Sequence, residues 1–112
     1  SLRSHPAQGL DFLREMARGT RDLVGDSMEA FSKGDLQLAR LASSKDDAID
    51  ELFANSKQAL LDLIRSRKDD GEAVLNYLLI AKYFEKISDH AVHIADWVVF
   101  AITGERELKQ EE

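Results

Sequence analysis

The sequence contains no cysteine and only one proline among its 112 residues. The lack of cysteine excludes disulfides, thiol catalysis, zinc fingers and iron–sulfur clusters. No apolar stretch approaches the roughly 20 residues that a membrane-spanning helix requires. The one proline, Pro6, stands near the start of the chain, whereas proteins built of β-strands usually carry proline and glycine in many turns. These absences predict an all-α protein made of a few long helices.

The chain carries more acidic than basic residues. Asp and Glu total 21 against 15 Lys and Arg, which gives a net charge of −6. Because nucleic-acid-binding proteins draw much of their affinity from a basic surface, we expect no nucleic acid partner. A hydrophobic content of 44% is sufficient for a packed core. The chain begins with Ser1 rather than methionine, so we expect an excised piece of a longer protein or a tag remnant.

Turn-forming residues divide the chain into three segments. Pro6 suits the first turn of a helix, and Gly34 followed by Asp35 is typical of a helix stop and a new helix cap. A polar turn over 66–71 and the glycine at 104 mark the other two boundaries. The sequence therefore predicts helices over about residues 6–32, 35–66 and 72–103. Short connections predict an antiparallel, up-down-up three-helix bundle that forms one domain over 1–112.

Apolar residues recur at helical spacing in the first two segments. In the first, the stripe runs from Leu10 to Phe31 and its acidic residues fall outside it. The stripe of the second segment comprises Ala39, Ala42, Asp46, Ile49, Phe53, Ser56, Leu60 and Leu63. Asp46 is thus a carboxylate on the predicted core side, and Asp50 follows one turn later. Such acids are costly unless they are paired, protonated or bound to a metal.

The third predicted helix is apolar around most of its circumference. Its charged residues between 73 and 103 are Lys82, Glu85, Lys86, Asp89 and Asp96. On a helical wheel they share an arc of about 100°. A three-helix bundle cannot bury so wide an apolar surface on one helix, so we expect another surface to cover it.

Two acidic pairs are predicted to lie at one level of the bundle. Asp46 and Asp50 are four residues apart, as are Glu85 and Asp89. With a turn near residue 69, the pair centres differ in level by about three residues, which is less than one helical turn. Four carboxylates at one level suit a hard cation such as Mg²⁺, Ca²⁺, Mn²⁺ or iron.

Two alternatives concern the surroundings of these acids. Ordinary surface ion pairs could neutralise them, with the cations supplied by Arg40, Lys45, Lys82 and Lys86. His93, one turn after Asp89, could extend a metal site or simply face solvent.

The segment from Tyr83 to Glu105, YFEKISDHAVHIADWVVFAITGE, resembles the last helix of a PhoU domain. The junction Ala30 to Asp35 and the segment Asp46 to Leu52 also resemble that family. PhoU proteins are bacterial regulators of phosphate uptake, built as tandem three-helix bundles. The resemblance covers nearly the whole chain and implies a single repeat similar to the C-terminal one of the family.

The resemblance implies a function both for the two acidic pairs and for the apolar third helix. Asp46, Asp50, Glu85 and Asp89 match the family's E(D)xxxD motifs, which bind metal ions such as iron, zinc, nickel or magnesium. The apolar third helix would pack against a sister repeat or against a second copy in a homo-oligomer. The family implies a non-enzymatic negative regulator, without catalytic residues, that links the ATPase of the phosphate ABC transporter to a sensor histidine kinase. Its usual setting is the cytoplasm, peripherally at the inner face of the membrane.

The residues are also compatible with three other functions. PhoU-like domains also occur as cytoplasmic parts of sodium–phosphate cotransporter-like proteins. A di-metal carboxylate oxidase is disfavoured, because that chemistry uses a four-helix bundle with two Glu-x-x-His motifs and no Glu here has His at that spacing. A metal-free helical assembly protein is a further alternative. Nothing in the residues shows directly that phosphate is bound.

Overall fold

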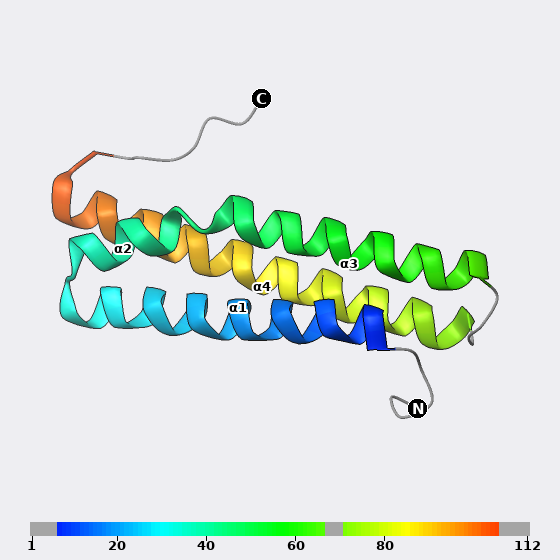
Figure 1. Cartoon of the computed structure of the whole chain (residues 1–112). Helices are drawn as coiled ribbons and strands as arrows, with labels where there is room; N and C mark the ends of the chain where they lie inside the picture. The colour runs from blue at the N-terminus through cyan, green and yellow to red at the C-terminus, as the bar shows by residue number, and fades with distance from the viewer. Residues whose placement is uncertain (1–6, 67–70, 106–112) are drawn as a thin grey trace.

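A computed structural model of the chain describes residues 7–66 and 71–105 (Figure 1). These residues form four α-helices and no strand, so the predicted all-α bundle is confirmed. The helices are α1 (Ala7–Lys33), α2 (Leu36–Ser43), α3 (Asp46–Ser66) and α4 (Gly71–Thr103). Figure 1 shows α1 running along the bundle, α2 and α3 returning one after the other, and α4 running back alongside them. The predicted role of Pro6 and the predicted turn residues 67–70 lie outside the described residues.

The junction between α1 and α2 has the predicted chemistry. Gly34 adopts a φ of +64°, a left-handed conformation in which a side chain would be strained, and so ends α1. The backbone N–H of Asp35 donates to the Ala30 carbonyl at 3.0 Å. The Asp35 carboxylate accepts the backbone N–H of Leu38 at 3.0 Å and caps α2. The change of chain direction between α1 and α2 therefore depends on the conformational and capping preferences of two adjacent residues.

The predicted continuous helix over 35–66 is wrong, because a turn at Ser44 and Lys45 interrupts it between α2 and α3. The backbone N–H of Lys45 donates to the Ala42 carbonyl, three residues back instead of four, at 3.2 Å. The Ser44 hydroxyl donates to the Leu41 carbonyl at 2.7 Å. The backbone thus closes a tighter three-residue turn in place of the helical one at this point, which interrupts the helix.

The hydrophobic core runs along the whole bundle between α1, α4 and the returning helices, with α3 at one end and α2 at the other. On α1, Met16, Leu23 and Ala30 are fully buried at seven-residue intervals. Phe31, which the predicted stripe placed in the core, is 73% exposed. Thr20 and Ser27, which lie on the predicted stripe, are buried, so only part of the stripe is displaced: Ala30 is buried in place of its neighbour Phe31.

Three buried hydroxyl groups lie between α1 and α4. Thr20 and Ser88 share a hydrogen bond of 2.9 Å between their hydroxyl oxygens. The Ser27 hydroxyl donates to the Ala91 carbonyl at 2.8 Å. Each of these side chains is at most 5% exposed, so the two helices meet through small polar groups as well as apolar ones.

The surface of α4 turned away from α3 remains partly uncovered, as the sequence predicts. We call this surface, with its neighbours on α1, the apolar outer face; it comprises Met28, Phe31, Ile87, Ile94 and Trp97. Two cavities of about 420 and 240 Å³ lie along it and share His90 and Ile94 in their walls. Within the described part of the chain, no helix is both long and apolar enough to cross a membrane.

Candidate functional site

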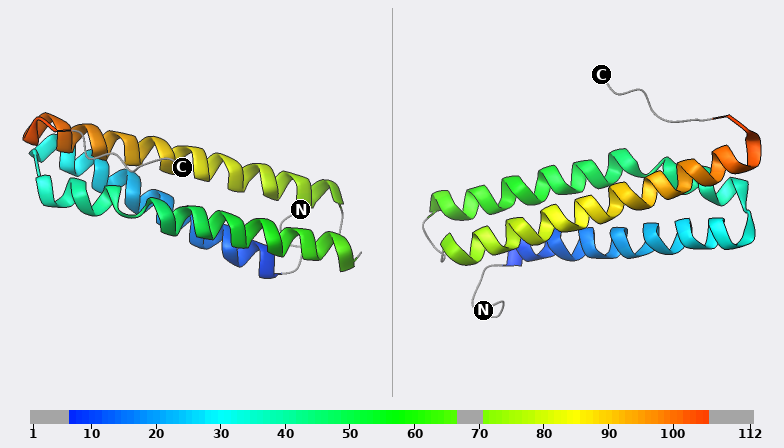
Figure 2. Two further views of the ribbon diagram at one scale, coloured as in Figure 1. Left: turned by 90° about the horizontal axis from the view of Figure 1, so that it is seen from above. Right: turned by 180° about the vertical axis from the view of Figure 1, so that it is seen from behind.

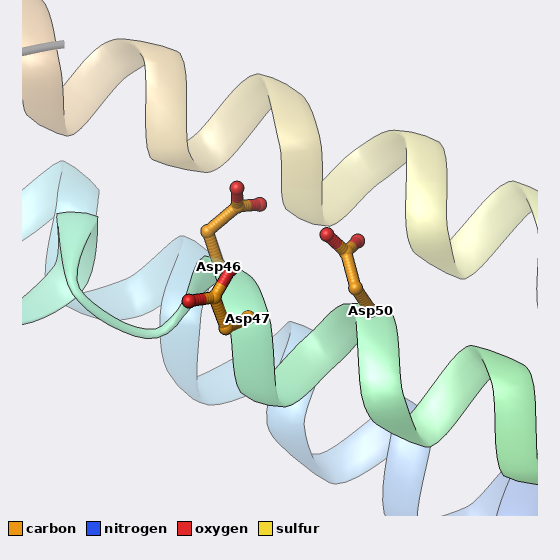
Figure 3. A group of neighbouring side chains, drawn as sticks. All are labelled: Asp46, Asp47 and Asp50. Carbon is orange, nitrogen blue, oxygen red and sulfur yellow. The ribbon is translucent and has the colours of Figure 1, made fainter. Parts of the chain in front are cut away.

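The predicted acidic residues come from two helices that pack side by side along the bundle (Figure 2). We call them, with one addition from the structure, the acidic cluster: Asp46, Asp47, Asp50, Glu85 and Asp89. The first three lie in the first turn and a half of α3, directly after the break, and the other two lie midway along α4. Figure 3 shows the carboxylates of Asp46 and Asp50 pointing toward α4.

The break between α2 and α3 changes the setting of Asp46. Sequence periodicity placed it in the middle of a long helix, whereas it is the first residue of α3. Asp46 and Asp47 both occupy the first turn, where the positive end of the helix dipole and free backbone N–H groups favour negative charge. The local structure therefore offsets part of the repulsion between carboxylates at this end of the cluster.

Three carboxylates of α3 lie close enough to share an ion. Asp46, Asp47 and Asp50 each offer an oxygen, and these oxygens all lie within 4.8 Å of one another. Metal–oxygen distances of roughly 2.0–2.6 Å place two ligand oxygens at most about 5 Å apart. The donor set thus fits a hard cation, because it consists of carboxylate oxygens alone.

The carboxylates of α4 lie within electrostatic reach of this triad. Glu85 and Asp89 both contribute to the raised pKa of Asp50. Glu85 is held by its own helix, since Lys82 Nζ pairs with its Oε1 at 3.0 Å. The Lys82 ammonium also lies 5.3 Å from the ring centroid of Phe53 on α3, a cation–π contact. The structure therefore brings the four predicted acids to one region, with the closest ligand grouping on α3.

Two members of the cluster have perturbed acidity. The pKa of Asp50 is raised to about 6, first by burial and then by the charges of the other four carboxylates. The pKa of Asp89 is also raised, first by burial and then by Glu85 and Asp46, while His93 and Lys82 act in the opposite direction. A bound cation would relieve this repulsion by favouring the charged forms.

Of the basic residues that could neutralise the cluster, only Lys82 forms a defined ion pair with one of the four predicted acids. Lys45 instead pairs with Asp26 of α1 at 3.3 Å. Among the described residues, no ion pair reaches Asp46, Asp50 or Asp89. In the described part of the chain, Asp46, Asp50 and Asp89 therefore have no ion pair, whereas Glu85 is paired with Lys82 and Asp47 makes an interaction of its own.

Sequence reasoning missed Asp47. A search for acids four residues apart selects Asp46 and Asp50 and passes over the residue between them. The signal that could have found it is the pair of adjacent aspartates after two serines, which is typical of a helix start.

The chain is similar to proteins that are named as accessory proteins of a phosphate-specific transport system. A family model described as "PhoU domain" matches residues 13–98. The chain is 33% identical over 104 residues to the phosphate-specific transport system accessory protein PhoU homolog 1 of Methanothermobacter thermautotrophicus, covering 90% of this chain and 46% of that protein. It is 33% identical over 92 residues to PhoU homolog 1 of Thermotoga maritima, covering 82% of this chain and 40% of that protein.

A third relative, PhoU homolog 2 of Mycobacterium tuberculosis, is 30% identical over 107 residues, covering 91% of this chain and 49% of that protein. The chain therefore spans about half the length of the curated relatives it matches. No solved structure matches the chain. The family model covers α2 and α3 in full, most of α1 and α4, and both parts of the acidic cluster, and the chain belongs to the PhoU family.

Proposed function

We propose that this chain is a regulatory metal-binding interaction module of phosphate transport and signalling, in which Asp46, Asp50, Glu85 and Asp89 hold the metal together with Asp47. The observation that carries the proposal is a cluster of carboxylates between α3 and α4 whose α3 members have oxygens within 4.8 Å. Raised pKa values at Asp50 and Asp89 support it, because burial and then mutual repulsion without an ion disfavour their charged forms.

The metal proposed is iron, magnesium, zinc or nickel, and the donor chemistry ranks these. Oxygen-only ligands favour magnesium and iron, whereas zinc and nickel sites usually include nitrogen or sulfur. His93 is exposed on α4 and interacts electrostatically with Asp89, so it is the nearest candidate for a nitrogen ligand. The metal would neutralise the cluster and join α3 to α4, without any bond being made or broken.

The proposed partners follow from family membership and from the relatives' names as transport system accessory proteins. In this proposal the protein represses phosphate-starvation genes by linking the ATPase of the phosphate transporter to a sensor histidine kinase. Its setting would be the cytoplasm, peripherally at the inner membrane face. A cluster of negative charge is suited to a cation and repels phosphate, so the proposal has the chain respond to phosphate through partners.

The apolar outer face is proposed as the second interaction surface. Phe31 and Trp97 are 73% and 50% exposed there, more than a large aromatic side chain in a finished core would be. Either a sister repeat or a second copy of the chain in a homodimer would cover this surface. The two occupants differ in the oligomeric state that the isolated chain adopts in solution.

The test of the metal proposal is the metal content of purified variants. We expect elemental analysis to find metal in the parent chain and none in a Glu85→Ala and Asp89→Ala double variant, with helicity by circular dichroism retained. The matched control is Asp11→Ala with Glu15→Ala, another acid pair four residues apart that is exposed on α1. Unchanged metal in the first variant, or no metal in the parent chain, would remove the metal claim.

A further inference from the structure

The turn between α2 and α3 is tied to both neighbouring helices by polar side chains. The Ser43 hydroxyl, on the last residue of α2, donates to the Oδ1 atom of Asp96 on α4. On the other side, Lys45 Nζ pairs with Asp26 Oδ2 of α1 at 3.3 Å. Asp46 follows immediately and begins α3. The start of the helix that bears three carboxylates of the acidic cluster is thus fixed from two sides.

These tethers matter because the helical hydrogen bonding is broken at this point. The regular bonding of α3 restarts where the Ile49 N–H donates to the Lys45 carbonyl at 3.2 Å. A helix that continues another without a break inherits its direction from the backbone, whereas one that follows a break does not. Side-chain contacts at the turn therefore decide where the first turn of α3 points.

Asp96 is suited to holding the α2–α3 turn in place and is not a member of the acidic cluster. It is 7% exposed and is the one buried carboxylate among the residues that the structure describes. A buried carboxylate is costly unless it is hydrogen-bonded, and the Ser43 hydroxyl supplies that bond. Asp96 is not one of the carboxylates whose oxygens lie within 4.8 Å of one another, so it is not part of the closest ligand grouping.

We propose that Ser43 and Asp96 are positioning residues for the metal site: their hydrogen bond fastens the α2–α3 turn to α4 and so aims the carboxylates of Asp46, Asp47 and Asp50. The inference rests on the proposed metal function. It differs from that function in assigning a role to two residues that need not touch the metal.

The binding test measures Mn²⁺ affinity by titration calorimetry on the full chain. We expect Ser43→Ala to weaken Mn²⁺ binding about tenfold, as the loss of an outer-shell partner commonly does. Ser43→Thr keeps the hydroxyl, and Asp96→Asn keeps an acceptor oxygen, so both should stay within about threefold of the parent. The matched control is Ser44→Ala, because the hydroxyl of Ser44 bonds only to the carbonyl of Leu41 on its own helix.

Two binding results would overturn the proposal. Ser43→Ala binding Mn²⁺ as tightly as Ser44→Ala would show that the bond does not position the site. Asp96→Asn losing affinity as completely as Asp50→Asn would make Asp96 a ligand instead.

A metal-free measurement separates this inference from the proposed function. If the parent chain binds no Mn²⁺, the metal function fails, but the turn can still be examined by amide hydrogen exchange. We expect Ser43→Ala to exchange faster than Ser44→Ala over residues 45–49, because the start of α3 is released from α4. Equal exchange in the two variants would refute the positioning role.

Discussion

Replacing Asp50 with Asn should stabilise the fold at pH 7 when metal is absent and destabilise it when metal is bound. The pKa of Asp50 in the folded chain is about 6, against 3.8 for an unperturbed Asp. The folded chain therefore binds this proton more tightly than the unfolded chain. The stabilisation that results is fully present below about pH 3.8 and is lost as the pH rises to about 6. At pH 7 the charged Asp50 destabilises the metal-free fold.

The size of the effect follows from the shift and the exposure. A shift of about two units corresponds to about 3 kcal/mol if the whole of it is expressed. Asp50 is exposed at the bundle surface, so solvent screening reduces the expected effect to about 1 kcal/mol. Asp50→Asn should then raise the metal-free midpoint of thermal unfolding by about 4 °C at pH 7 and change it little near pH 4.

With saturating Mn²⁺ the sign should invert. An ion at 100 times its dissociation constant stabilises the folded parent by about 2.7 kcal/mol, and a variant lacking a ligand forfeits much of this. The assay is thermal unfolding followed by circular dichroism, with chelator and with Mn²⁺, at both pH values. Glu51→Gln, the neighbouring exposed acid of α3, is the matched control. An Asp50→Asn variant that behaves like Glu51→Gln in all four conditions would refute the reasoning.

Four further predictions concern packing and association. Leu23→Ala should lower the free energy of unfolding by about 3 kcal/mol in urea titrations, because Leu23 is fully buried. Gly25→Ala should raise that free energy by up to about 1 kcal/mol, since its added Cβ meets no atom within 4 Å. Gly19→Ala should gain less, because its Cβ would lie 3.1 Å from Ile49 Cδ1. Trp97→Asp should convert a self-associated chain to monomer in sedimentation at high micromolar concentration; a monomeric parent would instead contradict association through the apolar outer face.

Local chemistry explains the parts of the fold that could be predicted. Gly34 and Asp35 end one helix and start the next through their own backbone and side-chain preferences. The identity of these two residues is therefore sufficient to predict the turn between α1 and α2. The break after Ser43 depends in addition on Asp96, which lies 53 residues later in the chain. No periodicity in the sequence reports that contact. The predicted helix over 35–66 was therefore too long, because neither the backbone turn at Ser44 and Lys45 nor this contact between distant residues alters the periodicity.

The candidate site likewise has one part that regular helix geometry predicts and another that depends on the packing of the bundle. Spacing and helix antiparallelism brought Asp46, Asp50, Glu85 and Asp89 into one region, because these depend on regular geometry. The addition of Asp47 depends on the helix start created by the break, and the exposure of Phe31 depends on how α1 turns between two neighbours. What could not be predicted is the rotation of each helix about its axis.

The hydroxyl groups between α1 and α4 fix the axial register of those two helices. Apolar side chains alone tolerate sliding, since one methyl group replaces another at similar cost. Displacing α1 by one turn, about 5.4 Å, would separate Thr20 from Ser88 and Ser27 from the Ala91 carbonyl. Each buried polar group left without a partner costs about 1–3 kcal/mol. These bonds therefore select one axial register for the α1–α4 pair, whereas neither of them constrains the position of α3.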